Sequence, residues 1–503
     1  MNPNSEDIVL QIRTQFEDIL AFVSKNYEKT PSVYQVERSL LTSLLSLGRA
    51  LLMAFILTQQ ESLRHTPSVC INGQVLPLHA HKRRALRSLF GKITFLRGYY
   101  YKEGTSYFLL DAHLKMPQHS LSDLLREWLC QLACYVPYHR SGNLLKDMIT
   151  QKLTPRPLEE AILEDSTLVE AFYQQLPPPD PATEATILVA QADGKGVPML
   201  PDSPPPERVR LGKGEKSCRK KEAIVTSVYT IAACVRTPQE VTASLFKKPT
   251  LLPRVAKPPG KKRSGPQNKR LFATLTGKKE AIAFTARQVG LREGDHIRER
   301  VALTDGAAAL QSQMRACLPG FSLVLDIIHA VEYLWEAGNS LYGEKSEKRA
   351  GWVEERTLLL LEGKTAAVIA DLRALASPQS RKQRAKSVLL KVADYYERNK
   401  DYMHYATYLA SGWPIATGVI EGACRHLVKD RCELSGMHWR VAGAEGVLRL
   451  RSVAENQDWE SFHDFRREQR QLSLYGRCSE GDSTIIERAA TRARGQVAEC
   501  LAA

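Results

Sequence analysis

The sequence predicts an α/β protein, and three observations support this fold class. After residue 185, apolar runs of strand length alternate with amphipathic helical segments, as in a central sheet covered by helices. Residues 328–410 contain few strand-like runs and are rich in Ala, Leu, Lys and Glu, which predicts a long helical region. Before residue 176, helical stretches alternate with β-branched and aromatic stretches, which indicates separate α and β modules.

Length, charge and cysteine content limit the possible classes of protein. A chain of 503 residues is expected to form about two to four domains. The net charge of +15 favours a polyanionic partner, although a generally basic soluble enzyme would also have it. Ten cysteines without disulfide-type spacing and a polar N-terminus favour a cytoplasmic protein. The apolar run Leu51–Leu57 is too short to cross a bilayer, so no membrane partner is expected.

Three modules are expected before the main α/β region. Residues 1–66 should be helical, because apolar residues recur at intervals of three and four. Residues 67–118 should form a small β-rich module, with a hairpin turn at Asn72-Gly73. Residues 119–176 contain three short helical segments, which fit either a helix-turn-helix unit or a plain helical subdomain.

The proline-rich segment 177–184 is expected to link these modules to the α/β core. The core should consist of residues 185–327 and 411–467, interrupted by the helical insertion 328–410. Residues 468–503 form a C-terminal tail to which the sequence assigns no role.

Two aspartates follow predicted strands, and a glutamate lies on a later predicted helix. Asp193 ends the apolar run 185–192, Asp305 ends the run Val301–Thr304, and Glu421 lies between flanking glycines. A single Asp-Gly pair usually marks a turn, but three such acids can converge on one point. Carboxylates are the ligands that Mg²⁺ prefers, and two ions about 3.5–4 Å apart can clamp a phosphodiester under attack. The pattern therefore predicts these three acids as catalytic and metal-binding residues for two Mg²⁺ or Mn²⁺ ions.

Two further groups lie at the end of the last predicted strand, residues 321–328. Asp326 and His329 are candidates for orienting the metal ligands or a phosphate. A purely structural histidine is an equally good interpretation of His329.

Basic tracts lie between the two aspartates. Residues 208–221 and 247–270 are rich in Lys and Arg, and the second contains five prolines and no acid. Such tracts cannot form a core and are expected to be loops that contact phosphates, with a solvated surface loop as the alternative. The candidate DNA-binding residues are Arg208, Arg210, Lys213, Lys216, Lys220, Lys221, Lys261, Lys262, Arg263, Lys269, Arg270, Arg425, His426, Lys429, Arg431 and Trp439.

Several stretches resemble the DDE transposases of bacterial insertion sequences, most closely the ISKra-type family. They are residues 192–199, 210–216, 303–307, 325–335, 418–431 and 435–439. The resemblance extends over about residues 68–455. It implies an RNase H-like catalytic core, interrupted by a helical insertion between the second Asp and the Glu, with Asp193, Asp305 and Glu421 as the metal-binding triad. Members of the family often carry paired cysteines after a tyrosine-rich strand, which residues 101–107 lack, so no zinc site is expected there.

The resemblance also implies a function. The expected protein is a prokaryotic, cytoplasmic and nucleoid-associated enzyme that binds double-stranded DNA at the terminal inverted repeats of its element through residues 1–175. It would cut at the element ends by two-metal-ion hydrolysis and join the 3′ ends to target DNA. A homo-oligomer is expected, because two ends must be held together. Two alternatives stay open: a catalytically silent, transposase-derived DNA-binding protein, and a junction-resolving RNase H-like nuclease that joins no strands.

Overall fold

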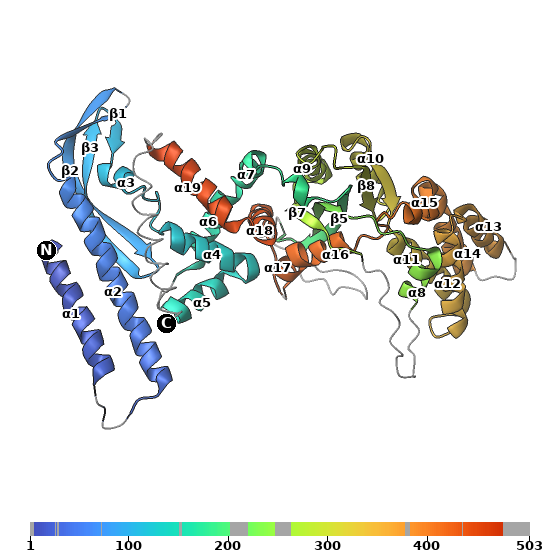
Figure 1. Ribbon diagram of the computed structural model, residues 1–503, viewed down its shortest axis with the longest axis horizontal. Helices are drawn as coiled ribbons and strands as arrows, with labels where there is room; N and C mark the ends of the chain where they lie inside the picture. The colour runs from blue at the N-terminus through green and yellow to red at the C-terminus, as the bar shows by residue number, and fades with distance from the viewer. Residues whose placement is uncertain are drawn as a thin grey trace. The chain divides into compact units, whose positions relative to one another are not determined.

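The computed structural model describes residues 5–475 except 26, 28–29, 72, 150–152, 202–219, 247–262, 378–382 and 435. The chain divides into two compact units, Met1–Ala161 with Glu460–Ala503 and Ile162–Trp459 (Figure 1). The fold is mixed α/β, which confirms the predicted fold class at this level. The basic residues predicted at 208–216 and 261–262 lie outside the described residues.

The first unit begins with a helical hairpin and an antiparallel sheet. The helices are α1 (Ser5–Ser24) and α2 (Val33–Ser62). The strands, in both chain and sheet order, are β1 (Ser68–Ile71), β2 (Gln74–Ser88), β3 (Gly91–Lys102) and β4 (Thr105–Tyr107). Ser32 caps α2 through a capping box with Gln35, which explains why the helix begins where it does. Met53 and Ile56 of α2 pack with Phe95 of β3 in the core of this unit.

Short helices complete the first unit. They are α3 (Leu109–His113), α4 (Asp123–Tyr135), α5 (Tyr138–Ile149) and most of α6 (Pro155–Ser166). The last described helix, α19 (Trp459–Tyr475), also belongs here, because Arg466 donates to Asp123 at 2.8 Å and Tyr475 donates to the carbonyl of Met116 at 2.9 Å.

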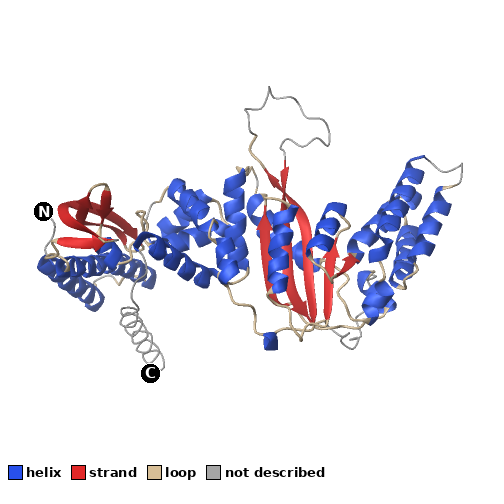
Figure 2. Ribbon diagram, turned by 90° about the horizontal axis from the view of Figure 1, so that it is seen from above, coloured by secondary structure: helices blue, strands red, loops and turns tan. Residues whose placement is uncertain are grey.

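The second unit is built on a five-stranded sheet in the order β7-β6-β5-β8-β9. The strands are β5 (Ile187–Pro198), β6 (Lys220–Ile231), β7 (Gln267–Thr274), β8 (Glu299–Thr304) and β9 (Ser322–Leu325). β5, β6 and β7 are antiparallel neighbours, whereas β8 and β9 run parallel to β5. Figure 2 shows these strands side by side with helices packed around them.

Alternating residues of the central strand face two separate cores. Leu188 and Ala190 of β5 pack with α9 (Lys278–Gly290) and α10 (Ala308–Cys317). Ile187 and Val189 pack with the helical region that follows β9. Side chains of a strand point alternately to its two faces, so one apolar run buries both sides of the sheet.

A helical region follows the sheet, as the sequence predicts for residues 328–410. It comprises α11 (Ile327–Tyr342), α12 (Glu347–Leu361), α13 (Thr365–Ala376), α14 (Gln383–Asn399) and α15 (Tyr405–Ala410). The chain then returns to the sheet as α16 (Gly418–Ala423), the π-helix η3 (Cys424–Lys429), α17 (Asp430–Cys432) and α18 (Val441–Glu455). Helices α7 (Val169–Gln175) and α8 (Pro238–Leu245) and the short η1 (Pro181–Thr183) and η2 (Lys400–Tyr402) complete the unit.

Two predicted elements are shorter than expected. The sequence also predicts a helix over 271–289, but the helix begins only at Lys278, because the first residues of that range extend β7 along β6. The strand predicted over 321–328 ends at Leu325, because Asp326 caps α11 with its side chain.

Candidate metal centre

Asp193 lies inside β5 and not at its end, which corrects the sequence prediction. β5 pairs with β6 as far as Pro198, and Asp193 is opposite Val225. On its other side, β5 pairs with β8 only as far as Gln191, which is opposite Leu303. Asp193 therefore lies just past the last β8 partner, at the edge of the sheet where the parallel strand β8 ends.

Asp305 follows β8 at this edge, and a tyrosine from α14 fixes its backbone. The hydroxyl of Tyr395 donates to the carbonyl of Asp305 at 2.9 Å, and the Asp305 side chain accepts from the N–H of Ala307 at 2.9 Å. Gly306 has a φ of +89°, and a Cβ there would lie 2.6 Å from the Tyr395 hydroxyl. Glycine is needed at this position both for its conformation and for its lack of a side chain.

Asp326 follows the neighbouring strand β9 and is fully buried. One carboxylate oxygen accepts from the N–H of Ile328 at 2.8 Å, and the other accepts from the hydroxyl of Thr417. Burial raises the pKa of Asp326, and these two hydrogen bonds oppose the rise. The carboxylate is therefore held rigidly at the start of α11.

Glu421 completes a group that could hold a metal ion. Ligand atoms of Asp326, His329 and Glu421 all lie within 4.8 Å of one another. Asp326 is buried, His329 is half-buried and Glu421 is exposed, so the group opens to solvent on the side of α16. The hydroxyl of Thr417 lies 3.3 Å from Glu421 Oε1. Thr417 therefore contacts the carboxylates of both Asp326 and Glu421.

Electrostatic interactions connect Asp193 to the other acids. Burial raises the pKa of Asp193, the charge of Asp305 raises it further, and the charge of His329 lowers it. The thiol of Cys424 donates to Asp193 Oδ2 at 3.4 Å. Asp193 and Asp305 thus lie near the Asp326–His329–Glu421 group, but the ligand atoms within 4.8 Å of one another include neither of these two predicted ligands.

The donor set fits a hard divalent cation. Asp326, His329 and Glu421 offer oxygen and nitrogen ligands. The charge of Asp305 helps to raise the pKa of Asp193, and the charge of Glu421 helps to raise the pKa of Asp326, so both acids gain when a cation lies beside them. The sequence prediction gave Asp326 and His329 only an orienting role. In the structure, their ligand atoms lie within 4.8 Å of that of Glu421, so all three could bind one ion. One feature of the sequence could have marked Asp326 as a metal ligand: like Asp305, it directly follows an apolar strand.

Two residues that the sequence did not reveal hold the acid-bearing elements together. Gln191 is fully buried, and its side-chain oxygen accepts from the N–H of Ile420, the residue before Glu421. Thr417 immediately precedes α16, and its hydroxyl donates to Asp326. Neither residue stands in a local motif, so no signal in the sequence marks it.

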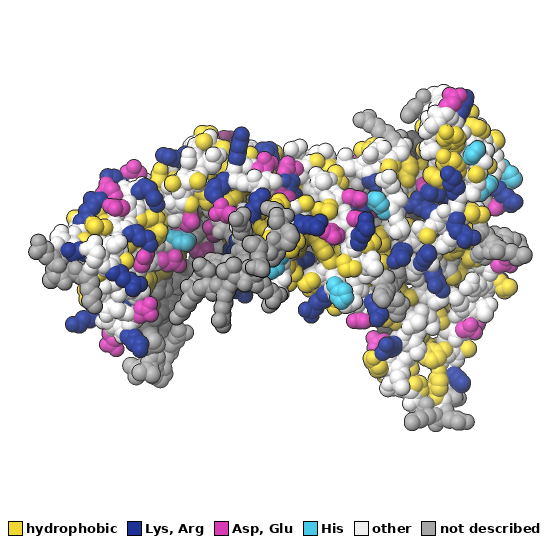
Figure 3. All heavy atoms as spheres, turned by 180° about the vertical axis from the view of Figure 1, so that it is seen from behind, with side chains coloured by type: hydrophobic (Ala, Val, Ile, Leu, Met, Phe, Trp, Pro, Cys, Tyr) yellow, Lys and Arg dark blue, Asp and Glu magenta, His cyan; other side chains and the backbone are white. Residues whose placement is uncertain are grey.

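The described candidate DNA contacts fall into an exposed set and a set engaged inside the protein. Within the exposed set, Lys220 pairs with Glu433, and Arg425 and His426 lie beside Asp430. The exposed side chains are Lys220, Lys221 and Lys269 on strands, and Arg425, His426 and Lys429 on the π-helix. On the face shown in Figure 3, Lys and Arg side chains are interspersed with acidic ones. π-Helices are rare and often occur at functional sites, and this one directly follows the helix that carries Glu421.

Four of the candidates are engaged inside the protein. Arg431 and Trp439 are buried and pack against each other, with the guanidinium 4.8 Å from the ring centroid. Arg263 donates to the carbonyl of Gly412, and Arg270 pairs with Asp458. The exposures of Arg431 (1%) and Trp439 (7%) correct the expectation that they contact DNA, because little of either residue reaches the surface.

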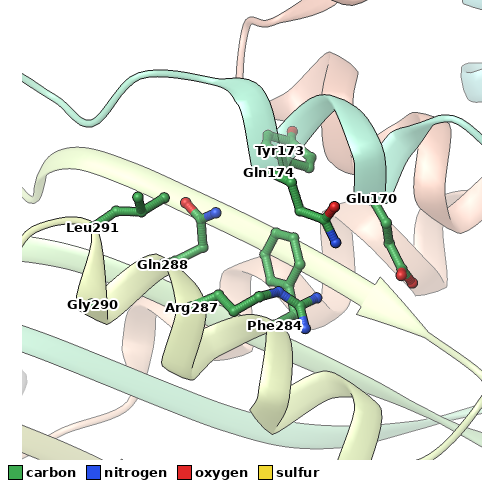
Figure 4. A pocket seen from close by; sticks show the side chains of 8 residues that line it. All are labelled: Glu170, Tyr173, Gln174, Phe284, Arg287, Gln288, Gly290 and Leu291. Atoms are coloured by element: carbon green, nitrogen blue, oxygen red, sulfur yellow. The ribbon is translucent and has the colours of Figure 1, made fainter.

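A separate cavity of about 240 Å³ lies between α7 and α9. Figure 4 shows Tyr173, Phe284 and Arg287 among the side chains around it. It shares no residue with the acidic group, so it contributes nothing to the metal centre.

Comparisons with known proteins do not identify this chain. No model of a protein family matches it, and no curated protein matches it. The interpretation of the site therefore depends on its own geometry and chemistry.

Proposed function

We propose that this chain is a Mg²⁺-dependent DDE-type DNA transposase with an RNase H-like core. The observation that supports this best is that acids from distant segments meet at one edge of the sheet, where Asp326, His329 and Glu421 lie within ligand distance. The strand order β7-β6-β5-β8-β9, with three antiparallel strands followed by two parallel ones, is the order of an RNase H-like sheet and supports the same proposal. The helical region between β9 and α16 corresponds to the insertion in this proposal.

In the proposed site, Asp193, Asp305, Asp326, His329 and Glu421 would hold Mg²⁺. Divalent cations bound there supply activation of the attacking hydroxyl and stabilisation of the leaving oxygen. Phosphoryl transfer requires little covalent chemistry from the protein, so its residues mainly position the groups. Tyr395 fixes the backbone of Asp305, and Cys424 donates to Asp193. Glu421 is exposed, so a cation held beside it would be open to a DNA phosphate.

The proposed DNA contacts follow the exposed basic residues. Arg425, His426 and Lys429 lie on the turn after Glu421, where positive charge would hold the backbone of the DNA being cut. Lys220 and Lys221 begin β6, and β6 pairs with the strand that carries Asp193. In this proposal, residues 1–175 recognise the element ends, and the protein acts at the nucleoid in a prokaryotic cytoplasm.

Two alternative functions share this structure. A silent DNA-binding protein derived from a transposase would bind DNA without needing Mg²⁺. A junction-resolving nuclease would use the same acids but would join no strands. The presence of all three predicted acids, Asp193, Asp305 and Glu421, favours an active enzyme over the silent protein.

Cleavage and joining assays test the proposal. The substrate is a linear duplex that carries the inverted repeats flanking the gene, incubated with Mg²⁺ and a target plasmid. We expect Asp193→Asn, Asp305→Asn and Glu421→Gln each to slow cleavage at least about 100-fold, because even partners of metal ligands typically cost 10- to 100-fold. The exposed Asp401→Asn in η2 is the matched control and should cut like the parent.

The outcome separates the three functions. Cut ends joined to the plasmid support a transposase, and cut ends that are never joined support a nuclease. Mg²⁺-independent binding without cutting supports the silent protein. If the three acid variants cut as fast as the parent, the site assignment is wrong.

A further inference from the structure

The hairpin of α1 and α2 exposes many large apolar side chains. On α1, four of them are between 42% and 50% exposed: Val9, Phe16, Leu20 and Val23. On α2, four are between 47% and 53% exposed: Leu41, Leu44, Leu51 and Phe55. Hydrophobic side chains are visible along this hairpin at the lower right of Figure 3. These eight residues are called the outer stripe below.

The outer stripe has the spacing of a helix–helix contact. On α1, Phe16, Leu20 and Val23 are separated by four and then three positions, and Val9 lies seven positions before Phe16. On α2, Leu41 and Leu44 are three positions apart, and Leu51 and Phe55 are four positions apart. Apolar residues at alternating steps of three and four form the seam by which one helix packs on another.

A side chain from the turn between β2 and β3 fills the gap in the stripe on α2. Gly48 lies midway between Leu44 and Leu51, and a Cβ there would lie 2.6 Å from the ring of Phe90. Phe90 is itself 43% exposed, so apolar surface continues from Leu44 across Phe90 to Leu51. The glycine thus allows the aromatic ring to complete the stripe.

Within the described part of the chain, the outer stripe belongs to no hydrophobic core. Ile8 of α1 and Met53, Ile56 and Leu57 of α2 form the core with the sheet, and none of them belongs to the stripe. The hairpin therefore has two apolar sides, one inside the unit and one facing solvent. A second apolar side of this length indicates an interaction surface.

We propose that two copies of this chain pair through their outer stripes. A two-fold pair buries the same surface on both copies and forms a bundle of four helices. A hairpin about 30 Å long with helices about 10 Å apart presents about 600 Å² per copy. The pair would bury about 1,200 Å², which is the lower limit for a specific interface.

The charges on the hairpin also favour a second copy. α1 contains four acids and one base, whereas α2 carries two exposed bases, Arg38 and Arg49, and two exposed acids, Glu37 and Glu61. Packing α1 of one copy against α2 of the other brings Glu17 and Asp18 towards these arginines. Opposite charges beside an apolar seam select the partner and its orientation.

A lipid surface is the main alternative occupant. Among the described residues, α2 is the one helix long and apolar enough to cross a membrane by length and composition alone, with 22% of its most apolar window buried. Its inner side is occupied by the sheet, and the charged Arg49 lies in its second half. A stripe bordered by charge fits another helix better than it fits lipid.

The oligomeric state of the full chain, without DNA or metal, tests the proposal. Sedimentation velocity over a range of concentrations would compare the parent with a variant carrying Leu44→Glu and Leu51→Glu. We expect a dimeric parent and a dimer dissociation constant at least about 100-fold higher in the variant, because the interface would bury unpaired charges. Leu390→Glu on α14, at a side chain that is 44% exposed, is the matched control and should dimerise like the parent.

Each outcome bears on the proposal. A monomeric parent, or a double variant that dimerises as tightly as the parent, overturns it. A monomeric parent that cosediments with phosphatidylcholine–phosphatidylglycerol vesicles overturns it in favour of a lipid surface. If circular dichroism shows that the double variant has lost helix, Phe16→Glu with Leu20→Glu makes the same test from α1. No readout involves DNA cleavage, so the pairing can stand even if the proposed function fails.

Discussion

The side-chain oxygen of Gln191 accepts a hydrogen bond from the backbone N–H of Ile420 at 3.0 Å. Gln191 lies two residues before Asp193 on β5, and Ile420 lies immediately before Glu421 on α16. The glutamine is fully buried, and its amide nitrogen donates to the hydroxyl of Tyr229 at 3.1 Å. A single side chain therefore sets the position of one predicted metal ligand relative to another.

Replacing this glutamine should weaken the site more than the fold. Gln191→Leu leaves the N–H of Ile420 without its acceptor, which costs about 1–3 kcal/mol of stability. Because α16 is then free to shift, we expect the Mg²⁺ concentration for half-maximal cleavage to rise at least about tenfold. Tyr229→Phe is the control: it removes the partner of the amide nitrogen and keeps the bond to Ile420. If both variants need the same Mg²⁺ as the parent, Gln191 does not position Glu421.

The sequence could predict the acids of the site but not the bonds that hold them. An apolar run followed by Asp is a local pattern, so the positions of Asp305 and Asp326 after strands could be read from neighbouring residues. The contact between Gln191 and Ile420 joins positions 229 residues apart, and no local pattern encodes the partner. Tyr395 and Asp305 are likewise 90 residues apart, on a helix and after a strand.

Element ends were the least predictable part of the fold for the same reason. Asp193-Gly194 resembles a turn, yet β5 continues through it, because each residue as far as Pro198 has a partner on β6. Pairing with another strand outweighs the turn preference of the dipeptide. The helical region after β9 was predictable, since its composition and periodicity extend over many turns.

Asp326 should contribute directly to metal binding. We expect Asp326→Asn to weaken the binding of Mn²⁺, measured by calorimetry without DNA, by at least about 100-fold, and Glu421→Gln to have a similar effect, because even partners of metal ligands typically cost 10- to 100-fold. Thr417→Val removes the hydroxyl that donates to Asp326 and should have a smaller effect in the same direction. Unchanged Mn²⁺ affinity in Asp326→Asn, with an intact fold by circular dichroism, would remove this aspartate from the ligand set.

Replacing Gly306 by alanine should cost more stability than the same replacement at another glycine with a positive φ. Gly306→Ala combines a strained φ of +89° with a Cβ only 2.6 Å from the Tyr395 hydroxyl. We expect a loss of stability of about 2–4 kcal/mol and a loss of cleavage, because relief of the clash moves Asp305. Gly320→Ala is the control: φ is +81° and nothing lies within 4 Å of its Cβ, so only the strain of about 1–2 kcal/mol applies.

Urea unfolding measures both glycine variants, and a third variant separates the clash from the strain. Tyr395→Phe removes the hydroxyl that the new Cβ would meet. In the Gly306→Ala background it should therefore recover part of the lost stability, although alone it destabilises by removing the bond to Asp305. Equal losses for Gly306→Ala and Gly320→Ala would show that the close approach of Tyr395 has no energetic consequence.

His463 should make the first unit sensitive to mild acid. Its side chain is fully buried on α19, and its Nδ1 accepts from Arg466 Nε at 3.2 Å. Burial, reinforced by the charges of Arg466, Arg467 and Arg126, lowers the pKa of His463 from 6.5 to about 3. The unfolded chain therefore binds this proton first, so the stabilisation is complete above pH 6.5 and is lost as pH falls towards 3.

The measurement is the free energy of unfolding by urea between pH 7.5 and 4.5, where protonation of this histidine can lower it by up to about 1.4 kcal/mol per pH unit. His463→Asn keeps an acceptor for Arg466 and cannot titrate in this range. We expect it to be less stable than the parent at pH 7.5 through lost packing, and to lose less stability on acidification. His65→Asn replaces an exposed histidine of the same unit and should retain the full acid sensitivity of the parent. A parent and a His463→Asn variant with parallel pH profiles would show that protonation of His463 does not limit folding in acid.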